Sequence, residues 1–448
     1  MGPVRIGNGC GFWGDNVDAP ILLAQEGRLD YLTLEYLAEL TMSILAQQKQ
    51  KDAQTGYAGD FLDALERLTP ILKQQPQLKI VTNAGGMNPA GCATRAREVL
   101  HKAGLGSLKI AVVQGDDLLP RLDELLAAGH ALKNLDTGEP LAKVRERVVS
   151  ANAYLGAAPI AESLRRGARI VITGRVADAS LTVGPALHEF GWTADDWDRL
   201  SAATVAGHLI ECGAQATGGL WCNWQLAPDL ANVGYPIAEM QPDGTFILTK
   251  PEGTGGAVNT ETVAEQLLYE VGDPAAYLTP DVTADFNSVR LASAGQDRVR
   301  VDSVRGRPAT DTYKVSIAYR DGFAASGMLV VAGPEASMKA RRAGEMLLDR
   351  LRRAGFEAAR SHIECIGAGD SLPGVLPAAD PAEVVLRVSI HDPRRAAVER
   401  FAKEFAPLVT SGPPGVTGYT TGRPPVREVF AYWPALLAKA AVQVEVHV

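Results

Sequence analysis

Residues Leu78-Lys79-Ile80-Val81-Thr82 form a short apolar run, and Asn83-Ala84-Gly85-Gly86-Met87-Asn88-Pro89 follows it directly. The run is rich in β-branched residues and has the length of a strand that is buried on both faces. The glycine and asparagine residues after it indicate a turn, and Pro89 suits the first turn of a helix. This stretch therefore predicts one strand, turn and helix of a parallel α/β sheet.

The same pattern recurs outward from this stretch through the first 200 residues. The apolar runs lie at Pro3–Ile6, Tyr31–Leu34, Leu78–Thr82, Leu108–Val113 and Arg169–Thr173. Helical patterns separate them, which predicts an α/β fold of repeated β-α units around a mainly parallel sheet. Loops beyond the carboxyl ends of parallel strands form the ligand crevice, so the turns after these runs are expected to share one rim.

The pattern changes after about residue 285. Strands are predicted at Val299–Val304, Thr312–Tyr319 and Ala325–Val331, with a hairpin turn at Arg320-Asp321-Gly322 and a helix at Ala336–Ala354. A second set then follows: a strand at Val384–Ile390, a helix at Pro393–Phe405, a loop over 409–425, and strands near Val426–Tyr432 and Val442–Val448. We expect an α+β region, for which a ferredoxin-like arrangement is one candidate.

Length and composition define the class of protein. The 448 residues exceed one ordinary core, and we predict three domains, at 1–285 (ligand-binding or catalytic), 286–375 (α+β) and 376–448. A net charge of −8 argues against nucleic acid or an anionic membrane as partner. No secretion signal and no run of about 18 apolar residues is apparent, and the five cysteines are scattered, so we expect a cytoplasmic protein without a structural metal.

The first turn, Gly9-Cys10-Gly11-Phe12-Trp13-Gly14, matches G-x-G-x-x-G, and Glu35 follows about twenty residues later, as in dinucleotide sites. Two aromatic residues crowd this turn, however, and Pro20 interrupts the helix expected after it. The alternative is a glycine turn that packs closely on its neighbours, with Trp13 in or near a pocket. Asp15 is either a helix cap or a pocket carboxylate.

Two later turns are candidates for binding an anion. The 83–89 turn offers backbone N–H groups to a carboxylate or phosphate, with Asn83, Gly85, Gly86 and Asn88 as its candidate residues. The alternative is a tight turn whose asparagine side chains bond its own backbone. After the fifth run, Arg175 provides a planar fork for an anion.

Acid–base candidates follow Arg175. Asp178 lies three residues after it and either moves a proton or forms a structural ion pair with it. His208, Glu211 and Cys212 share one helix face, so Glu211 is placed to orient a His208 that acts as general acid or base. A satisfied core histidine is the alternative, and no residue is nominated to complete a zinc site.

The segment Gly253-Thr254-Gly255-Gly256 resembles a phosphate-cradling loop without the Gly-Lys-Ser/Thr ending of a P-loop. It is the candidate cofactor-binding segment, and a flexible loop is the alternative. No cofactor follows with certainty from the residues, and the CoA moiety of a substrate is one candidate group.

Five segments together resemble the acyclic terpene utilisation (AtuA-type) family. They are Arg5–Asp15, Tyr31–Glu39, Asn83–Pro89, Thr173–Asp178 and Gly253–Gly256. The resemblance spans roughly residues 1 to 365, and the remaining segment resembles the small AtuA-like domain that accompanies some members. It implies a role in degrading citronellol- and geraniol-type terpenes through acyl-CoA intermediates, without a catalytic assignment to carry over.

The resemblance and the residues lead to one principal hypothesis. It is a catabolic enzyme that acts on a branched or unusual organic acid, or its acyl-CoA thioester, by non-redox hydration, dehydration or C–C lyase chemistry. Arg175 and the 85–88 turn would hold an anionic group, His208 with Glu211 or Asp178 would move a proton, and Asp15 and Glu35 would line the rim. The alternatives are a CoA- or nucleotide-binding accessory subunit and an NAD-dependent oxidoreductase. We expect a small-molecule partner and a homo-oligomer.

Overall fold

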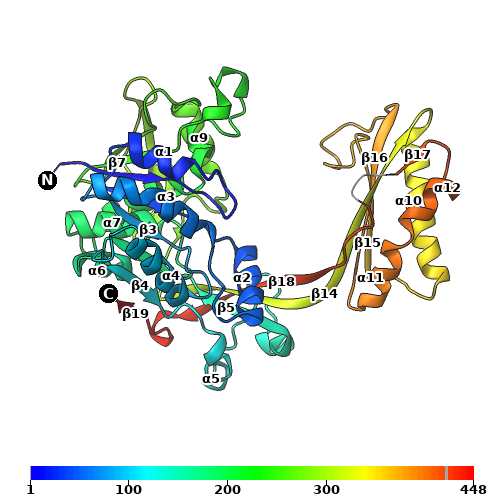
Figure 1. Cartoon of the computed structure of the whole chain (residues 1–448), viewed down its shortest axis with the longest axis horizontal. Coiled ribbons are helices and arrows are strands. Elements are labelled where there is room, and N and C mark those ends of the chain that lie inside the picture. The colour runs from blue at the N-terminus through cyan, green and yellow to red at the C-terminus, as the bar shows by residue number, and fades with distance from the viewer. Residues whose placement is uncertain (1, 419–421) are drawn as a thin grey trace. The chain divides into compact units, whose positions relative to one another are not determined.

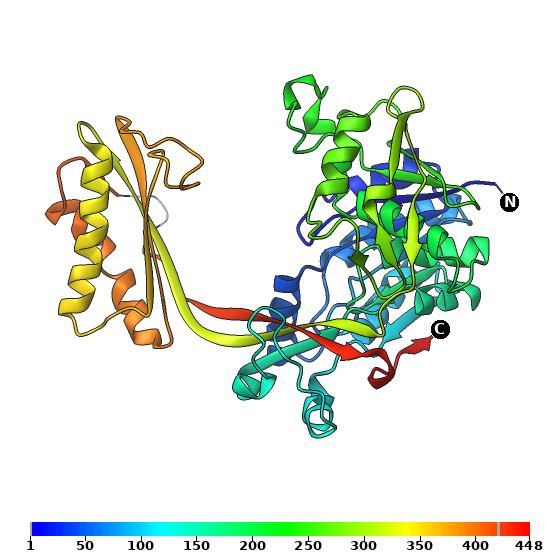
Figure 2. The same ribbon diagram turned by 180° about the vertical axis from the view of Figure 1, so that it is seen from behind.

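The structure is a computed structural model that describes residues 2–418 and 422–448. The chain forms two compact units (Figures 1 and 2). Unit 1 comprises Met1–Ala318 and Tyr432–Val448, and unit 2 comprises Tyr319–Ala431. The domain boundaries expected at 285 and 375 stay a prediction.

A ten-stranded sheet forms the centre of unit 1. Its middle strands pair in parallel in the order β1 (Val4–Asn8), β2 (Tyr31–Leu34), β3 (Lys79–Thr82), β6 (Ile170–Thr173) and β4 (Ile110–Gln114). Antiparallel strands extend it: β7 (Ile237–Met240), β8 (Phe246–Thr249), β12 (Val299–Asp302) and β11 (Arg290–Ser293) beyond β1, and β19 (Glu445–His447) beyond β4. The α/β class is thus confirmed, and the sheet is mixed rather than mainly parallel.

Helices cover both faces of this sheet. Adjacent residues of a strand face opposite sides, and in β2 Leu32 packs in the cluster of α1 and α3, whereas Tyr31 bonds Glu189 of α7. The helices of unit 1 are α1 (Ala19–Glu26), α2 (Glu39–Lys51), α3 (Asp60–Gln74), α4 (Pro89–Lys102), α5 (Leu122–Ala127), α6 (Ala158–Arg165), α7 (Ser180–Phe190), α8 (Trp197–Glu211) and α9 (Thr260–Leu268). Strand β5 (Val148–Ala153) pairs with β14, and β9 (Tyr277–Leu278), β10 (Thr283–Asp285) and β13 (Arg305–Arg307) form a small sheet.

Unit 2 has an antiparallel sheet with helices on one face (Figure 2). Its elements are β14 (Thr312–Ala332), which begins in unit 1, α10 (Ala336–Arg353), β15 (Arg360–Ile366), β16 (Glu383–Asp392), α11 (Arg395–Ala402), α12 (Phe405–Ser411), β17 (Val416–Thr417) and β18 (Arg427–Ala438). The strand order is β15-β16-β14-β17, and β18 also pairs with β14. This β-α-β-β-α-β order is that of a ferredoxin-like arrangement.

Local sequence signals were wrong at two places. The hairpin predicted at Arg320-Asp321-Gly322 is part of one continuous strand, because long-range pairing of β14 with β16 and β18 prevails over the local turn. The helix predicted at Pro393–Phe405 is present as α11, and a separate short helix, α12, follows it. Pro20 does not interrupt α1 but lies at its first turn. Of the loop expected over 409–425, residues 419–421 lie outside the described residues.

Among the residues that the structure describes, no helix is both long enough and apolar enough to cross a bilayer.

Candidate functional site

The carboxyl ends of β2, β3 and β6 bring Glu35, Asn83 and Arg175 together. Glu35 directly follows β2, and one of its carboxylate oxygens accepts the Leu37 N–H at 2.9 Å and the Asn83 side-chain amide. The other oxygen is buried without a hydrogen-bond partner among the described residues. A buried carboxylate that keeps one free acceptor is suited to exchanging a proton with a ligand.

Arg175 is the most buried charged group of this site, with 1% of its surface exposed. Its guanidinium donates to the Leu37 carbonyl oxygen at 2.7 Å and to the Asp178 carboxylate. The guanidinium also lies over the Tyr154 ring, 4.3 Å from the ring centroid. Only Nε lacks a partner in the described structure. The two outer nitrogens of Arg175 are therefore bonded to protein groups and are not available to bind a substrate.

Asp178 is the member of the site that faces open space, since 38% of its side chain is exposed. Desolvation by the surrounding protein raises its pKa to about 7, assisted by the charges of Glu211 and Glu39 and opposed by Arg175. Burial, followed by the charge of Asp178, also holds the pKa of Glu35 well above its usual range. The site thus contains two carboxyl groups whose pKa values lie above their usual range, and that of Asp178 lies near neutrality.

A second layer of polar groups surrounds Arg175. The Tyr154 hydroxyl donates to Glu39 at 2.6 Å, and the Lys314 ammonium lies 3.3 Å from the same carboxylate. Burial opposes ionisation of Glu39, but the Tyr154 bond and the Lys314 charge outweigh it and lower the pKa of Glu39 to about 2. Lys314 keeps 45% of its side chain exposed, so it is a cation of this layer that an incoming anion can reach.

His208 lies beside this cluster as a buried residue whose ring nitrogens both have partners. Nδ1 is 3.2 Å from Glu211 and Nε2 is 2.9 Å from the Gln266 carbonyl oxygen. Burial lowers the pKa of His208, but the bond and charge of Glu211 outweigh it and raise the pKa. The second Glu211 oxygen is buried without a partner in the described chain. The contact predicted between His208 and Glu211 is present, and its geometry is that of a satisfied core histidine.

The 83–89 turn uses most of its own hydrogen-bonding groups. The N–H groups of Gly86, Met87 and Asn88 donate to carbonyl oxygens of Asn83, Gly56 and Gly85. The Asn88 side chain caps α4 through Gly91 and donates to Thr55 at 2.9 Å. Among the turn residues, only Asn83 directs its side chain to Glu35. The geometry favours the tight-turn interpretation for the remainder.

Asp15 and Trp13 form no bond to Arg175 in the described structure, although Trp13 packs against the cluster that contains Leu37 and Met87. Asp15 accepts the Gly11 N–H at 2.7 Å and the Tyr235 hydroxyl at 2.6 Å, and the Trp13 indole donates to Asp60 at 3.0 Å. A cavity of about 210 Å³ lies next to Asp15 and Asp60. The bonds of Asp15 hold the turn at residues 9–14 in place, and of the two alternatives Asp15 is a carboxylate that lines this cavity and not the cap of α1, which begins after Asp18.

That glycine turn is filled by protein. A Cβ on Gly11 would lie 2.8 Å from the Cys212 backbone, so the glycine is needed for close packing against the end of α8. Helix α1 does not start at this turn, because it begins only at Ala19. The requirement for a pyrophosphate site, a helix that opens at the turn, is therefore not met.

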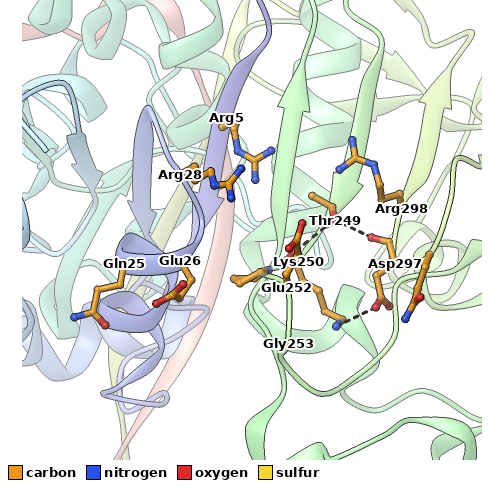
Figure 3. Close-up of a pocket in the computed structure, with 12 residues that line it drawn as sticks. Arg5, Gln25, Glu26, Arg28, Thr249, Lys250, Glu252, Gly253, Asp297 and Arg298 are labelled. Atoms are coloured by element: carbon orange, nitrogen blue, oxygen red, sulfur yellow. Dashed lines mark hydrogen bonds and ion pairs between the residues drawn. The ribbon is translucent and has the colours of Figure 1, made fainter.

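The Gly253–Gly256 loop belongs to a further cavity, of about 730 Å³, that Gly253 lines (Figure 3). The N–H groups of Gly255 and Gly256 donate to carbonyl oxygens of Asn232 and Pro228. Two of the amides expected to cradle a phosphate are thus used within the protein.

Sequence reasoning did not include Tyr154, Glu39, Lys314 or Asp116 among the site residues. Tyr154 follows β5, a strand that no apolar run identified, and Lys314 belongs to β14. Asp116 accepts the Arg175 N–H at 2.8 Å and the Asn152 amide at 2.9 Å. Its position directly after β4 was the available signal, because carboxyl ends of parallel strands meet at one edge.

The assembled groups suit proton transfer next to a buried positive charge. In the described part of the chain, no group of three His, Cys, Asp or Glu side chains is arranged to hold a metal ion. A comparison with protein families matches residues 4–448 to the one described as acyclic terpene utilisation family protein AtuA. The match includes the carboxyl-terminal segment that was expected as a separate small domain. No curated protein and no solved structure matches the chain.

Proposed function

This chain belongs to the acyclic terpene utilisation family AtuA, and from that membership we propose that it hydrates or dehydrates a methyl-branched organic acid or its acyl-CoA thioester. The observation that supports this chemistry is the pair of carboxyl groups, Glu35 and Asp178, whose pKa values are both raised around the buried Arg175. General acid–base catalysis is most efficient when the pKa of the catalytic group lies near the working pH.

In the proposed hydration, each carboxyl group has one role. Ionised Asp178 removes a proton from water while the water oxygen bonds to the β-carbon of an α,β-unsaturated acyl group. The electron pair of the double bond moves to the α-carbon, where protonated Glu35 delivers a proton. One water is added, and Asp178 returns its proton to Glu35 through solvent. The reverse sequence is the dehydration.

Arg175 and Lys314 have different roles in this proposal. Arg175 is a positioning residue, because its bonds to Leu37 and Asp178 fix the site and its charge limits how far both carboxyl pKa values rise. Lys314 is the exposed cation that attracts the anionic substrate.

The test is turnover of methyl-branched α,β-unsaturated acids and their CoA thioesters by the full chain in deuterated water, followed by mass spectrometry. We expect addition of one water and one carbon-bound deuteron, lost in Glu35→Gln and Asp178→Asn and retained in Asp123→Asn, whose carboxylate is remote and exposed. The proposal would be refuted if no compound of the panel gained water and a carbon-bound deuteron. Full activity of Glu35→Gln and Asp178→Asn would refute it as well.

The same panel separates the remaining functions. An accessory binding subunit would be stabilised by CoA thioesters without turnover, by about 2.7 kcal/mol at 100 times the dissociation constant. An NAD-dependent oxidoreductase would change the nicotinamide absorbance. The tightly packed glycine turn gives the latter no support.

A further inference from the structure

A second polar cavity of unit 1 lies apart from the acid–base site. Its volume is about 730 Å³, and three arginines from separate elements line it: Arg5 of β1, Arg28 before β2, and Arg298 before β12 (Figure 3). None of the three contacts the groups around Arg175 that were described above. The proposed acid–base chemistry gives this cavity no role.

The arginine end of the cavity has more positive than negative charge. Arg5 and Arg298 share a single carboxylate, Glu239, as their ion-pair partner. Arg28 forms no ion pair or side-chain hydrogen bond within residues 2–418 and 422–448. Two guanidinium groups therefore share one carboxylate, and Arg28 adds a third positive charge that has no ion-pair partner among the described residues.

The opposite end of the cavity is lined by acidic side chains. Lys250 is 3% exposed and is neutralised by Asp297, whose carboxylate lies 3.2 Å from the ammonium. Glu26 and Glu252 are exposed to solvent on the same wall. In Figure 3 the three arginines lie above these acidic side chains. A ligand that fits both ends has a strong anion at one end and hydroxyl or amino donors at the other.

We propose that this cavity binds the phosphate of an adenosine-type nucleotide, either a free nucleotide or the nucleotide portion of CoA. Guanidinium groups bind phosphate oxygens through paired N–H donors, and carboxylates accept bonds from ribose hydroxyl and adenine amino groups. Arg28 is the direct phosphate ligand, whereas Arg5 and Arg298, whose guanidinium groups bond Glu239, contribute positive charge beside it. The Gly253–Gly256 loop contributes a wall at Gly253, since the amides of Gly255 and Gly256 are already bonded.

The experiment is titration calorimetry of the full chain with inorganic phosphate, ADP, CoA and dephospho-CoA, and with adenosine as the probe without phosphate. We expect ADP or CoA to bind, adenosine not to bind, and the affinity to fall as salt is added. Arg28→Gln should weaken binding at least about tenfold, as expected for loss of one charge-assisted contact worth about 1.4 kcal/mol or more. Arg298→Gln is a second variant of the same end.

The matched control is Arg97→Gln, an exposed arginine of α4 that does not line the cavity. CoA binding without dephospho-CoA binding would assign the contact to the 3′-phosphate, and ADP binding would assign it to the diphosphate. The proposal is overturned if no phosphate compound binds, if adenosine binds as well as ADP, or if Arg28→Gln and Arg97→Gln behave alike. Because the readout is binding, these outcomes are independent of turnover at Asp178.

Discussion

Replacing Asp116 by asparagine should remove a pH-dependent loss of stability from unit 1. Asp116 is buried, and its carboxylate accepts bonds from the Arg175 N–H and the Asn152 amide. Burial raises the pKa of Asp116 from 3.8 to about 6, against the effect of these bonds. An asparagine keeps an acceptor oxygen for both donors and cannot ionise, so it isolates the cost of the charge.

The magnitude follows from the pKa difference. Each pKa unit corresponds to about 1.4 kcal/mol, so the ionised Asp116 costs the folded state about 3 kcal/mol above neutral pH. The folded state binds more protons than the unfolded state between the two pKa values, so stability falls as pH rises through this window. About 1 kcal/mol of the cost is already present at about pH 4.5, which leaves a change of about 2 kcal/mol up to about pH 7.5.

The assay is urea unfolding followed by tryptophan fluorescence at about pH 4.5 and about pH 7.5. All 6 tryptophans belong to unit 1, so the signal reports the unit that contains Asp116. The free energy of unfolding of the Asp116→Asn variant, relative to that of wild type, should rise by about 2 kcal/mol from the lower to the higher pH. Asp123→Asn, at a side chain that is 80% exposed, should gain nothing comparable. A variant-minus-wild-type difference that is the same at both pH values would refute the reasoning.

Three further substitutions test the site's framework by thermal or urea unfolding. Gly86→Ala should destabilise by about 1–3 kcal/mol, because φ is +48° there and a Cβ would overlap a leucine side chain; an unchanged midpoint would contradict this. Tyr154→Phe should cost about 1.5–3 kcal/mol through loss of the 2.6 Å bond to Glu39, and less in strong acid, where that carboxylate is protonated. The pKa of His208 is raised in the folded state, so its contribution to stability is full in acid and is lost as pH rises. His208→Gln should therefore lower the free energy of unfolding more at about pH 5.5 than at about pH 8.5. The opposite order would exclude a stabilising role for protonated His208.

The sequence alone determined the elements whose stability comes from local pattern. Strands β2 and β3 were placed to within one residue, and α10 likewise, because period and turn residues are local properties. It also determined that Glu35, Asn83 and Arg175 follow strands of one sheet and so share an edge.

Tertiary structure alone decided which polar groups complete the site and which do not. Tyr154 and Lys314 reach Arg175 and Glu39 only because β5 pairs with β14, a contact between distant segments that no local pattern encodes. The continuity of β14 and the antiparallel strands beyond β1 have the same origin. Burial, which sets the protonation of Asp116, is likewise a property of the packed molecule, because desolvation depends on neighbours from several strands and not on adjacent residues.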